Sequence, residues 1–327
     1  MNILLSCIGK RSYIADYFRL ELKGAGKVIG TSNTPWTPGF SSCDEAVIMP
    51  PISSSEYIPA MLDACCRYDV RGILSFFDPD VYCLSCHYDE FCSIGVVPVL
   101  PRESAATIGF NKLKTFQFLT DLSISVPLTT ESLATAMKWL ESGKMAFPLV
   151  VKPRCGFGSF NTFVAQNIPQ LRAFFEYADD MIVQQFVEGV ALNVDGLGDL
   201  NAKAISVVPW RKILSRLGET ERSITIDDPD LVQLGVRLIE EVGIIGPLDA
   251  DFIQDAGGTL WTLELNTRFG GGYPVSHLAG ADFPRLILEM LAGKKRIRGL
   301  ARYQRGVTMM KKLQVIPGPA AEDVEKA

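Results

Sequence analysis

The first hundred residues alternate short apolar runs with segments of helical periodicity, and this alternation restricts the fold more than any other feature of the chain. Residues 2–6 (NILLS) form a short apolar run of the kind found in buried strands. Further strands are predicted at residues 28–31, 46–49, 72–75 and 96–99, and helices at residues 12–23, 56–68 and from about 80 to 92. Strands that alternate with helices predict a parallel, doubly wound sheet.

Ligands of such a sheet bind beyond the carboxyl ends of its strands. The residues predicted there are Gly9, Lys10, Arg11, Asn33 and Asp78, and the polar ones are candidates for substrate contact. The turn after the first strand reads SCIGKR and has no GxGxxG pattern. A nicotinamide dinucleotide needs that pattern for its pyrophosphate, so the sequence argues against a dehydrogenase.

A new unit follows the linker at residues 124–130, and its centre is a glycine-rich turn between two strands. Residues 148–152 (PLVVK) predict an apolar strand ending on Lys152, and residues 162–165 predict the next one. The turn, PRCGFGSFN, lacks the GK[ST] of a P-loop, but its free backbone N–H groups suit a polyphosphate. Lys152 is costly to bury alone, and a phosphate would provide its partner. The alternative is an ordinary hairpin turn whose lysine reaches solvent.

Two later segments offer further contacts. Residues 181–186 (MIVQQF) predict a strand whose main-chain edge, around residues 185–187, would pair with an adenine ring. A polar excursion, SRLGETERS, is either a solvated surface or a site for an anion and substrate. The basic residues around this excursion are Arg211, Lys212, Arg216 and Arg222.

Residues 246–272 predict a β-hairpin, in which LDADFIQ and TLWTLELN are joined by the turn DAGG. Glu264 and Asn266 are two residues apart and therefore share a face, where Asp251 of the partner strand can meet them. Such oxygen ligands suit a hard cation such as Mg²⁺, and Arg268 would reach a phosphate oxygen bound to it. Taken alone, the segment fits the solvated face of an edge hairpin equally well.

Composition excludes several classes of protein. The chain has 327 residues, about two domains' worth, with 47% hydrophobic and 21% charged residues, which is typical of a folded protein. The net charge is −5 without a basic block, so nucleic acid is not the expected partner. No apolar run reaches the roughly 18 residues of a membrane span, and MNILLSCIGKR fits a strand better than a signal peptide. We therefore expect a cytoplasmic protein.

Eight cysteines are expected to be reduced thiols in that compartment. Four potential metal ligands gather in one segment, at Cys83, Cys86, His87 and Cys92. This segment, VYCLSCHYDEF, is predicted to be helical, and no second CxxC pair completes a zinc site. A metal role there is disfavoured.

The ordered set NKLKTFQFL, PLVVKPRCGFGSF, IVQQFVEG, LDADFI and LELNTRFGGG resembles the ATP-grasp superfamily, and within it the single-module relatives of the carbamoyl-phosphate synthetase large chain. GKRSYIADYF, SNTPWTPG and FDPD extend the resemblance over nearly the whole chain. It implies an α/β and α+β fold, with an N-terminal doubly wound parallel sheet (pre-ATP-grasp) followed by a two-lobed ATP-grasp domain. The implied domains are residues 1–107, a small lobe at 108–183 with a glycine-rich flap, and a large lobe at 184–327.

The resemblance also implies roles for individual residues. Lys112 and Lys152 match the basic residues on the nucleotide phosphates, and Arg268 matches the arginine that stabilises the transferred phosphoryl group. The matches to the metal ligands are Asp251, Glu264 and Asn266. The matches to the flap and to the adenine hinge are Gly156, Gly158, Ser159, Gln184, Gln185, Phe186 and Val187. The implied cofactors are ATP and Mg²⁺, with Mn²⁺ as an alternative.

Three positions depart from the family pattern. Phe160 is bulky where relatives commonly carry a second Arg-Gly or similar in the flap. Ala191 stands where many relatives place a glutamate that meets the ribose. Asp251 stands where close relatives often have glutamine. The first two departures leave open whether the flap closes fully and how the ribose is held.

The resemblance therefore implies an ATP-dependent ligase that activates a carboxylate as an acyl phosphate and joins it to an amine. The alternatives are an enzyme that activates bicarbonate with ammonia, as carbamoyl-phosphate synthetases do, and a non-catalytic ATP-binding regulatory protein. The expected partners are a small carboxylate and an amine, without nucleic acid or membrane, in a possible homodimer. The candidate substrate contacts are Lys10, Arg11, Asn33, Asp78, Arg211, Arg216, Arg222 and Tyr273.

Overall fold

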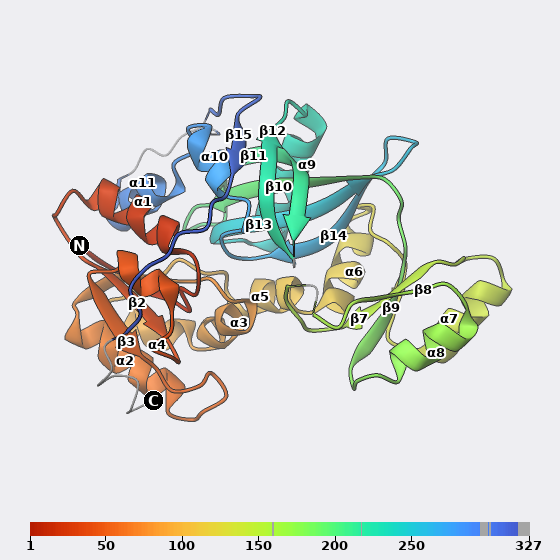
Figure 1. Ribbon diagram of the computed structural model, residues 1–327, viewed down its shortest axis with the longest axis horizontal. Helices are drawn as coiled ribbons and strands as arrows, with labels where there is room; N and C mark the ends of the chain where they lie inside the picture. Colours follow the sequence, from red (N-terminus) through yellow and green to blue (C-terminus); the bar gives the residue numbers. More distant parts are fainter. Residues whose placement is uncertain (159, 217, 295–299, 301, 320–327) are drawn as a thin grey trace.

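The computed structural model describes residues 1–158, 160–216, 218–294, 300 and 302–319. Three sheets organise these residues, and Figure 1 shows the small lobe, with β7, β8 and β9, projecting away from the rest. In the described part of the chain, no helix combines the length and the apolar character needed to cross a bilayer.

The N-terminal sheet is parallel, with the strand order β3-β2-β1-β4-β5. The first strand is almost fully buried because helices cover both faces, as the apolar run predicts. The order reverses at β1, so the predicted doubly wound sheet is confirmed, with its switch point at that strand. The elements are β1 (Asn2–Ser6), α1 (Ser12–Leu22), β2 (Val28–Ser32), η1 (Pro38–Ser42), β3 (Glu45–Ile48), α2 (Tyr57–Arg67), β4 (Val70–Ser75), α3 (Asp78–Cys86), α4 (Tyr88–Ser93) and β5 (Val97–Pro98).

Two short helices, α5 (Glu103–Phe110) and α6 (Lys112–Asp121), lead into the small lobe and pack against the edge of the large sheet. Asn111 caps the second helix by accepting hydrogen bonds from two of its first N–H groups. The lobe is an antiparallel sheet in the order β6-β9-β7-β8, with α7 and α8 packed against it. Its elements are β6 (Thr129–Thr130), α7 (Leu133–Glu141), β7 (Leu149–Pro153), β8 (Phe163–Ala165), α8 (Ile168–Phe175) and β9 (Met181–Gln185).

The large lobe contains a sheet of six strands in the order β14-β13-β10-β11-β12-β15, antiparallel throughout. Helix α9 lies on β10 and β11, where Gly235 allows close contact: a Cβ there would lie 2.7 Å from Val207. The elements are β10 (Val190–Gly198), β11 (Ala204–Arg216), β12 (Glu219–Thr225), α9 (Pro229–Val242), β13 (Gly246–Gln254), β14 (Leu260–Asn266), α10 (Pro274–Leu278), α11 (Phe283–Leu291) and β15 (Thr308–Met310).

The polar excursion SRLGETERS contains the end of β11 and the start of β12, and Leu217 between them lies outside the described residues. The outer half of β11 is largely solvent-exposed, so its side chains give no apolar alternation from which a strand could be predicted. The cysteine-containing segment likewise forms two helices that meet at His87 rather than one. The domain boundaries at residues 107 and 183 remain a prediction.

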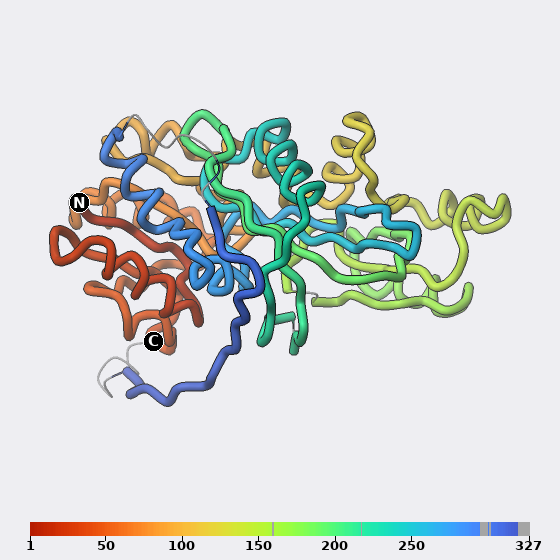
Figure 2. The backbone as a smooth tube through the Cα atoms, turned by 90° about the horizontal axis from the view of Figure 1, so that it is seen from above, coloured from red at the N-terminus to blue at the C-terminus, as the bar shows by residue number. Residues whose placement is uncertain are grey.

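Beyond β15 the chain runs in extended conformation from the large lobe to the N-terminal domain, as Figure 2 shows. Pro317 and Gly318 reach the loop after β2, where a Cβ on Gly318 would lie 3.3 Å from the indole of Trp36. The end of the described chain therefore connects the large lobe to the first domain.

Candidate active site

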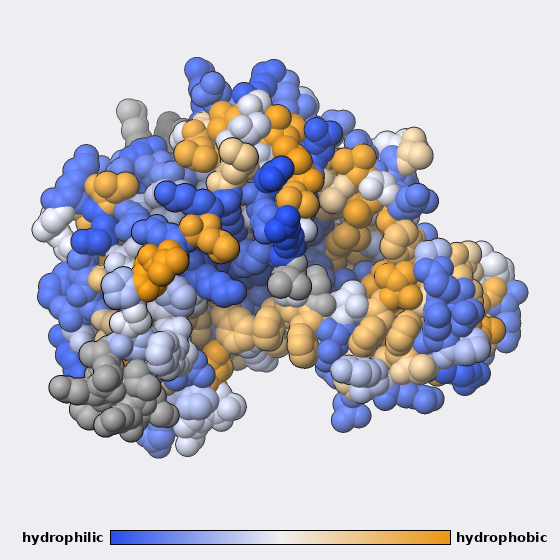
Figure 3. Space-filling view, in the orientation of Figure 1, coloured by the Kyte–Doolittle hydropathy of each residue, from blue (hydrophilic) through white to orange (hydrophobic). Residues whose placement is uncertain are grey.

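A cavity of about 410 Å³ lies where the N-terminal domain, the glycine-rich turn and the large sheet meet. Figure 3 shows the molecule hollowed between its main body and the small lobe, with hydrophilic side chains in the hollow. The cavity is lined by Arg11, Phe76, Phe77, Asp78, Lys152, Phe157, Gly158, Asn193, Trp210, Lys212, Gly218, Glu219, Thr220, Asp249, Asp251, Leu263, Glu264, Asn266, Arg268, Gly271 and Gly272.

The hairpin of β13 and β14 supplies the floor of this cavity. Its turn is fixed by Asp255, which accepts hydrogen bonds from two backbone N–H groups of the turn, and by Gly258 at a φ of 84°. Asp251 is paired with Glu264 across the strands, and Asp249 is paired with Asn266. Residues two apart on a strand share a face, so all four side chains point to the same side. The hairpin is not an isolated edge ribbon, because β13 also pairs with β10.

Glu264 is held by two lysines from the small lobe and the helix before it. Lys152 Nζ donates a hydrogen bond of 2.9 Å to Glu264 Oε1, and Lys112 Nζ lies 4.0 Å from the same oxygen. Burial opposes ionisation of Glu264, but the two lysines outweigh it and lower its pKa to about 2. Burial lowers the pKa of Lys112, against the effect of Glu264. Residues 112 and 264 come from segments 152 positions apart in the chain, and the fold joins them.

Asp251 is held by a third lysine, Lys212 of β11. Lys212 Nζ donates a hydrogen bond of 2.6 Å to Asp251 Oδ1, and Asn193 Nδ2 donates one of 2.7 Å to the same oxygen. Asn266 Nδ2 lies 3.3 Å from the other oxygen, so two of the predicted metal ligands touch. Although burial would lower it, the pKa of Lys212 is raised by Asp251 and Asp249. The sequence placed Lys212 among basic residues of uncertain role, and its position inside the cavity was missed.

Arg268 connects the large lobe to the N-terminal domain. Its Nε and Nη2 donate hydrogen bonds of 3.1 and 3.0 Å to Asp78 Oδ2, and its Nη1 lies 3.6 Å from Asp249 Oδ2. Burial opposes the charge, but Asp78 and Asp249 raise the pKa of Arg268. Burial and the nearby Asp251 raise the pKa of Asp249 to about 6. Arg268 is thus a fixed cation at the centre of the cavity.

The glycine-rich turn lies over the cavity. Lys112 Nζ donates a 3.0 Å hydrogen bond to the carbonyl of Gly156, and the ring of Phe157 packs edge-on against Phe77 at 4.5 Å. Gly158 touches the β11–β12 turn, where a Cβ on Gly218 would lie 3.0 Å from the Gly158 carbonyl. Phe160 points outward with 71% of its surface exposed. Ser159, the other predicted flap residue, lies outside the described residues.

The predicted adenine hinge lies at the end of β9 and does not line this cavity. Gln184 is buried, and its side chain donates a 3.0 Å hydrogen bond to Thr129. Strand pairing ends at Gln185, so Phe186 and Val187 follow as irregular backbone.

Of the eight predicted substrate contacts, Arg11 and Asp78 line the cavity. Tyr273 does not, because it is fully buried and its hydroxyl donates to the Ala281 carbonyl and accepts from the Phe283 N–H. Five others are outside the cavity lining: Lys10, Asn33, Arg211, Arg216 and Arg222. Arg211 illustrates the reason, since its neighbours Trp210 and Lys212 point into the cavity and alternate side chains of a strand point to opposite faces.

The glycine run after β14 shapes the cavity wall. A Cβ on Gly270 would lie 2.5 Å from Asp249, one on Gly271 would lie 2.8 Å from Glu219, and one on Gly272 would lie 2.2 Å from the indole of Trp210. Each glycine therefore makes room for one side chain of the cavity. Trp210, Glu219 and Thr220 were not predicted as site residues.

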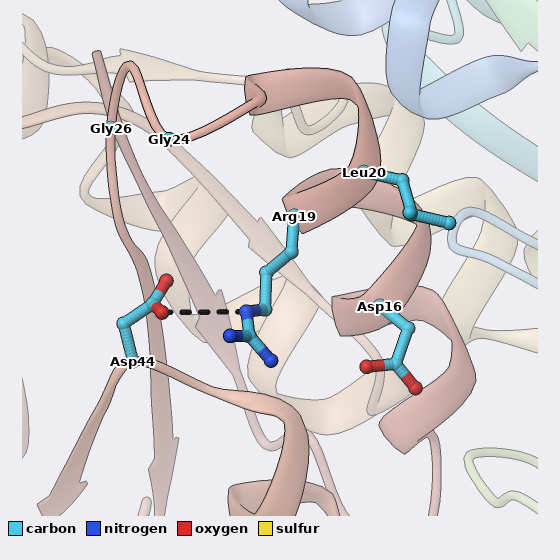
Figure 4. A pocket seen from close by; sticks show the side chains of 6 residues that line it. All are labelled: Asp16, Arg19, Leu20, Gly24, Gly26 and Asp44. Carbon is cyan, nitrogen blue, oxygen red and sulfur yellow. Dashed lines mark ion pairs between the residues drawn. The ribbon is translucent and has the colours of Figure 1, made fainter.

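Two other cavities have fewer charged side chains in their lining than this one. One, of about 500 Å³, lies beside α1, and Figure 4 shows Arg19 there pointing to Asp44. The two form an ion pair of 3.3 Å, so the cation in this hollow is already paired. The other, of about 960 Å³, lies between the loop after β2 and residues 316–319 and is mostly apolar. Within the described ranges, no group of three or more His, Cys, Asp or Glu side chains is placed to hold a metal ion, at the cysteine segment or elsewhere, and His87 contacts Glu90 at 2.6 Å.

Comparison with known proteins identifies two parts of the chain. Residues 3–100 match the PylC-like N-terminal domain, and residues 110–272 match the ATP-grasp domain. The chain is 27% identical over 220 residues to D-alanine–D-alanine ligase of Ectopseudomonas mendocina (strain ymp), covering 60% of this chain and 68% of that protein. It is 24% identical over 314 residues to carbamoyl-phosphate synthase of Methanobrevibacter smithii (strain ATCC 35061 / DSM 861 / OCM 144 / PS), covering 92% of this chain and 83% of that protein.

Among solved structures, the fold is similar to the biotin carboxylase domain of Hydrogenobacter thermophilus 2-oxoglutarate carboxylase, crystallised with MgADP, ADP and bicarbonate. The TM-score is 0.73 at 15% identity, over 93% of this chain and 71% of that one. The parallel N-terminal sheet and the two antiparallel sheets that follow it therefore form an arrangement already known from an enzyme of this architecture.

Proposed function

The chain is an ATP-grasp ligase with a PylC-like N-terminal domain, and we propose that its cavity activates a small carboxylate as an acyl phosphate and joins it to an amine. The products are an amide or peptide bond, ADP and phosphate. A carboxylate does not react with an amine at neutral pH, because its leaving group is poor. Transfer of the γ-phosphoryl group from ATP provides a good leaving group, and such transfer needs positioning and charge neutralisation more than a covalent catalyst.

The observation that carries this proposal is the convergence of three lysines and Arg268 on the carboxylates of the β13–β14 hairpin at the floor of the cavity. Lys112 and Lys152 meet at Glu264, Lys212 meets Asp251, and Arg268 lies beside Asp249. Without nucleotide, these cations are neutralised by carboxylates. When ATP binds, Lys112 and Lys152 transfer to its phosphates, and Lys212 and Arg268 stabilise the phosphoryl group during its transfer to the carboxylate.

The donor set fits Mg²⁺. Asp251, Glu264 and Asn266 supply hard oxygen ligands from adjacent strands, and the low pKa of Glu264 keeps it ionised at neutral pH. When bound, the metal ion neutralises phosphate charge and orients the γ-phosphate. Mn²⁺ prefers similar ligands, and we propose that it can replace Mg²⁺.

The remaining roles concern the nucleotide. We propose that backbone groups of residues 184–187 pair with the adenine ring, since strand pairing ends there. We propose that the turn at Gly156 and Gly158 closes over the phosphates, which would exclude the water that hydrolyses an acyl phosphate. Ser159, predicted for the same role, lies outside the described residues. We further propose that the enzyme is a homodimer in solution, which light scattering of the purified protein can check.

A direct test combines the purified protein with ATP, Mg²⁺ and pairwise mixtures of small acids and amines, amino acids included, and measures ADP. We expect ADP release that depends on one acid and one amine, with a product of the corresponding condensed mass. ADP release that depends on bicarbonate and ammonia would instead support carbamoyl-phosphate chemistry. A protein that binds ATP without releasing ADP in any mixture would contradict the ligase proposal.

A further inference from the structure

Arg11 is a cation in the cavity that forms no ion pair with a carboxylate of the described part of the chain, although Glu219 and Asp78 line the same cavity. It follows β1, and its Nη1 donates hydrogen bonds to two backbone carbonyls, those of Phe269 at 2.6 Å and Phe76 at 3.4 Å. Among the described residues, no carboxylate oxygen lies within 4.0 Å of its guanidinium, and its Nε and Nη2 donate no hydrogen bond. A partly desolvated guanidinium with free donors is costly unless an anion binds it.

The neighbouring Arg268 differs from Arg11 because it has two carboxylate partners. The charge of Arg268 is balanced by direct contacts with Asp78 and Asp249. Arg11 is instead repelled by Arg268, and Glu219 and Asp78 compensate only from beyond ion-pair distance. The two arginines line the same cavity, so they present two cations to whatever binds between the domains. Arginine recognises a carboxylate through paired N–H groups in a planar fork, and the free Nε and Nη2 of Arg11 form such a pair.

Glu219, which lines the same cavity, offers an acceptor for a positive group. Glu219 Oε2 accepts a hydrogen bond from Lys311 at 2.9 Å, while Oε1 accepts none from the described residues. The carboxylate packs directly on Gly271, and any side chain there would displace it. Glu219 feels the charges of both Arg11 and Arg268, so it belongs to the same end of the cavity. Arg11 can thus bind an anionic group and Glu219 a cationic group within the same cavity.

We propose that this end of the cavity holds the amine substrate as an α-amino acid, with its carboxylate on Arg11 and its ammonium group beside Glu219. The inference deepens the proposed ligase function and rests on it. The carboxylate on Arg11 is not the one that is activated, so the product keeps a free carboxylate. The space of about 410 Å³ accommodates an amino acid beside a transferred phosphoryl group.

Binding measurements test this without turnover. The full chain is loaded with a non-hydrolysable ATP analogue and Mg²⁺, and calorimetry then measures a panel of free amino acids, the α-amide of each one and inorganic phosphate. We expect at least one amino acid to bind about 30-fold more tightly than its α-amide, because the amide lacks the charge that Arg11 recognises. Phosphate should not compete with it. An equally tight amide, a competing phosphate or the absence of any amino-acid binding would overturn the inference.

Variants assign the preference to named residues. Arg11→Gln should bind acid and amide equally weakly with unchanged affinity for the nucleotide analogue, and Arg11→Lys should restore part of the preference and guards against misfolding of the first variant. Arg19→Gln removes a matched arginine of α1 that pairs with Asp44 outside the cavity and should behave as wild type. Glu219→Gln should reduce the preference for an amino acid over its α-hydroxy analogue. An Arg11→Gln protein that keeps the acid preference would overturn the assignment.

The two proposals fail separately. ADP release by a pair of substrates in which no amino acid is preferred over its amide would overturn the amino-acid inference and leave the ligase function standing. An acid-over-amide preference that Arg11→Gln removes, in a protein that never releases ADP, would overturn the ligase function instead.

Discussion

Arg268 donates two hydrogen bonds to one oxygen of Asp78, and the two residues, 190 positions apart, belong to different domains. Asp78 is the first residue of helix α3 in the N-terminal domain. Arg268 follows β14, the second strand of the hairpin that carries the proposed metal ligands. The guanidinium is therefore positioned by the N-terminal domain, and the cavity is complete only when the two domains are docked.

Replacing Asp78 with Asn tests whether this contact positions the arginine. The amide keeps the shape and one acceptor but loses the charge, so Arg268 should become less well fixed. We expect kcat to fall by about 10- to 100-fold with little change in the KM for ATP, because a small displacement of a group acting on the transition state has that cost. Asp89→Asn, at an exposed acid paired with Arg102, is the control and should retain full activity. An unchanged kcat for Asp78→Asn would show that the contact only joins the domains.

Replacing Glu264 with Gln removes both a proposed metal ligand and the partner of two lysines. ADP release should fall by about 10³-fold or more, since positioning and charge neutralisation supply most of the catalysis. The unfolding free energy should also fall by about 1–3 kcal/mol, because Lys152 and Lys112 lose their carboxylate partner in a buried setting. The measurements are steady-state ADP release and urea denaturation. Glu240→Gln, at a surface pair with Lys203, should change neither, and an active, folded Glu264→Gln protein would refute the metal assignment.

Much of this arrangement follows from local sequence. Lys152 ends an apolar strand and Asp251, Glu264 and Asn266 alternate along a hairpin, so their faces follow from the period of two. Lys212 and Glu219 were not predicted as site residues because they lie on the largely exposed outer half of β11 and at the exposed start of β12, where the sequence shows no apolar alternation. The same strand places Arg211 on the opposite face, although its sequence neighbours reach the cavity. Which side chains of β11 enter a site depends on pairing with β10, a long-range contact that the local pattern does not encode.

Lys212→Met tests the residue that the sequence pattern missed. Methionine keeps the length of the side chain but removes its charge, so Asp251 loses its strongest partner and the phosphoryl group loses one cation. We expect kcat to fall by about 100-fold, comparable with the removal of one preorganised donor in other enzymes. Lys203→Met, at an exposed residue just before the same strand, should have nearly normal activity. If Lys212→Met raised only the KM for ATP, its role would be nucleotide binding rather than stabilisation of the transfer.

The pH dependence of stability offers a test that needs no substrate. The pKa of Glu264 falls from an ordinary value of 4.5 to about 2 in the folded protein, so its ionised form stabilises the fold above pH 4.5. That stabilisation is lost as the pH falls from about 4.5 to about 2, because the folded state then gains the proton the unfolded state has already bound. After allowance for the one-third exposure of the side chain, we expect the contribution to be about 1–2 kcal/mol. The free energies of unfolding of wild type and Glu264→Gln, measured in EDTA without nucleotide, should therefore differ at pH 6 and converge by about pH 2–3. A difference that stayed constant across this range would mean that the loss of the Glu264 carboxylate acts through packing rather than through its charge on Lys152 and Lys112.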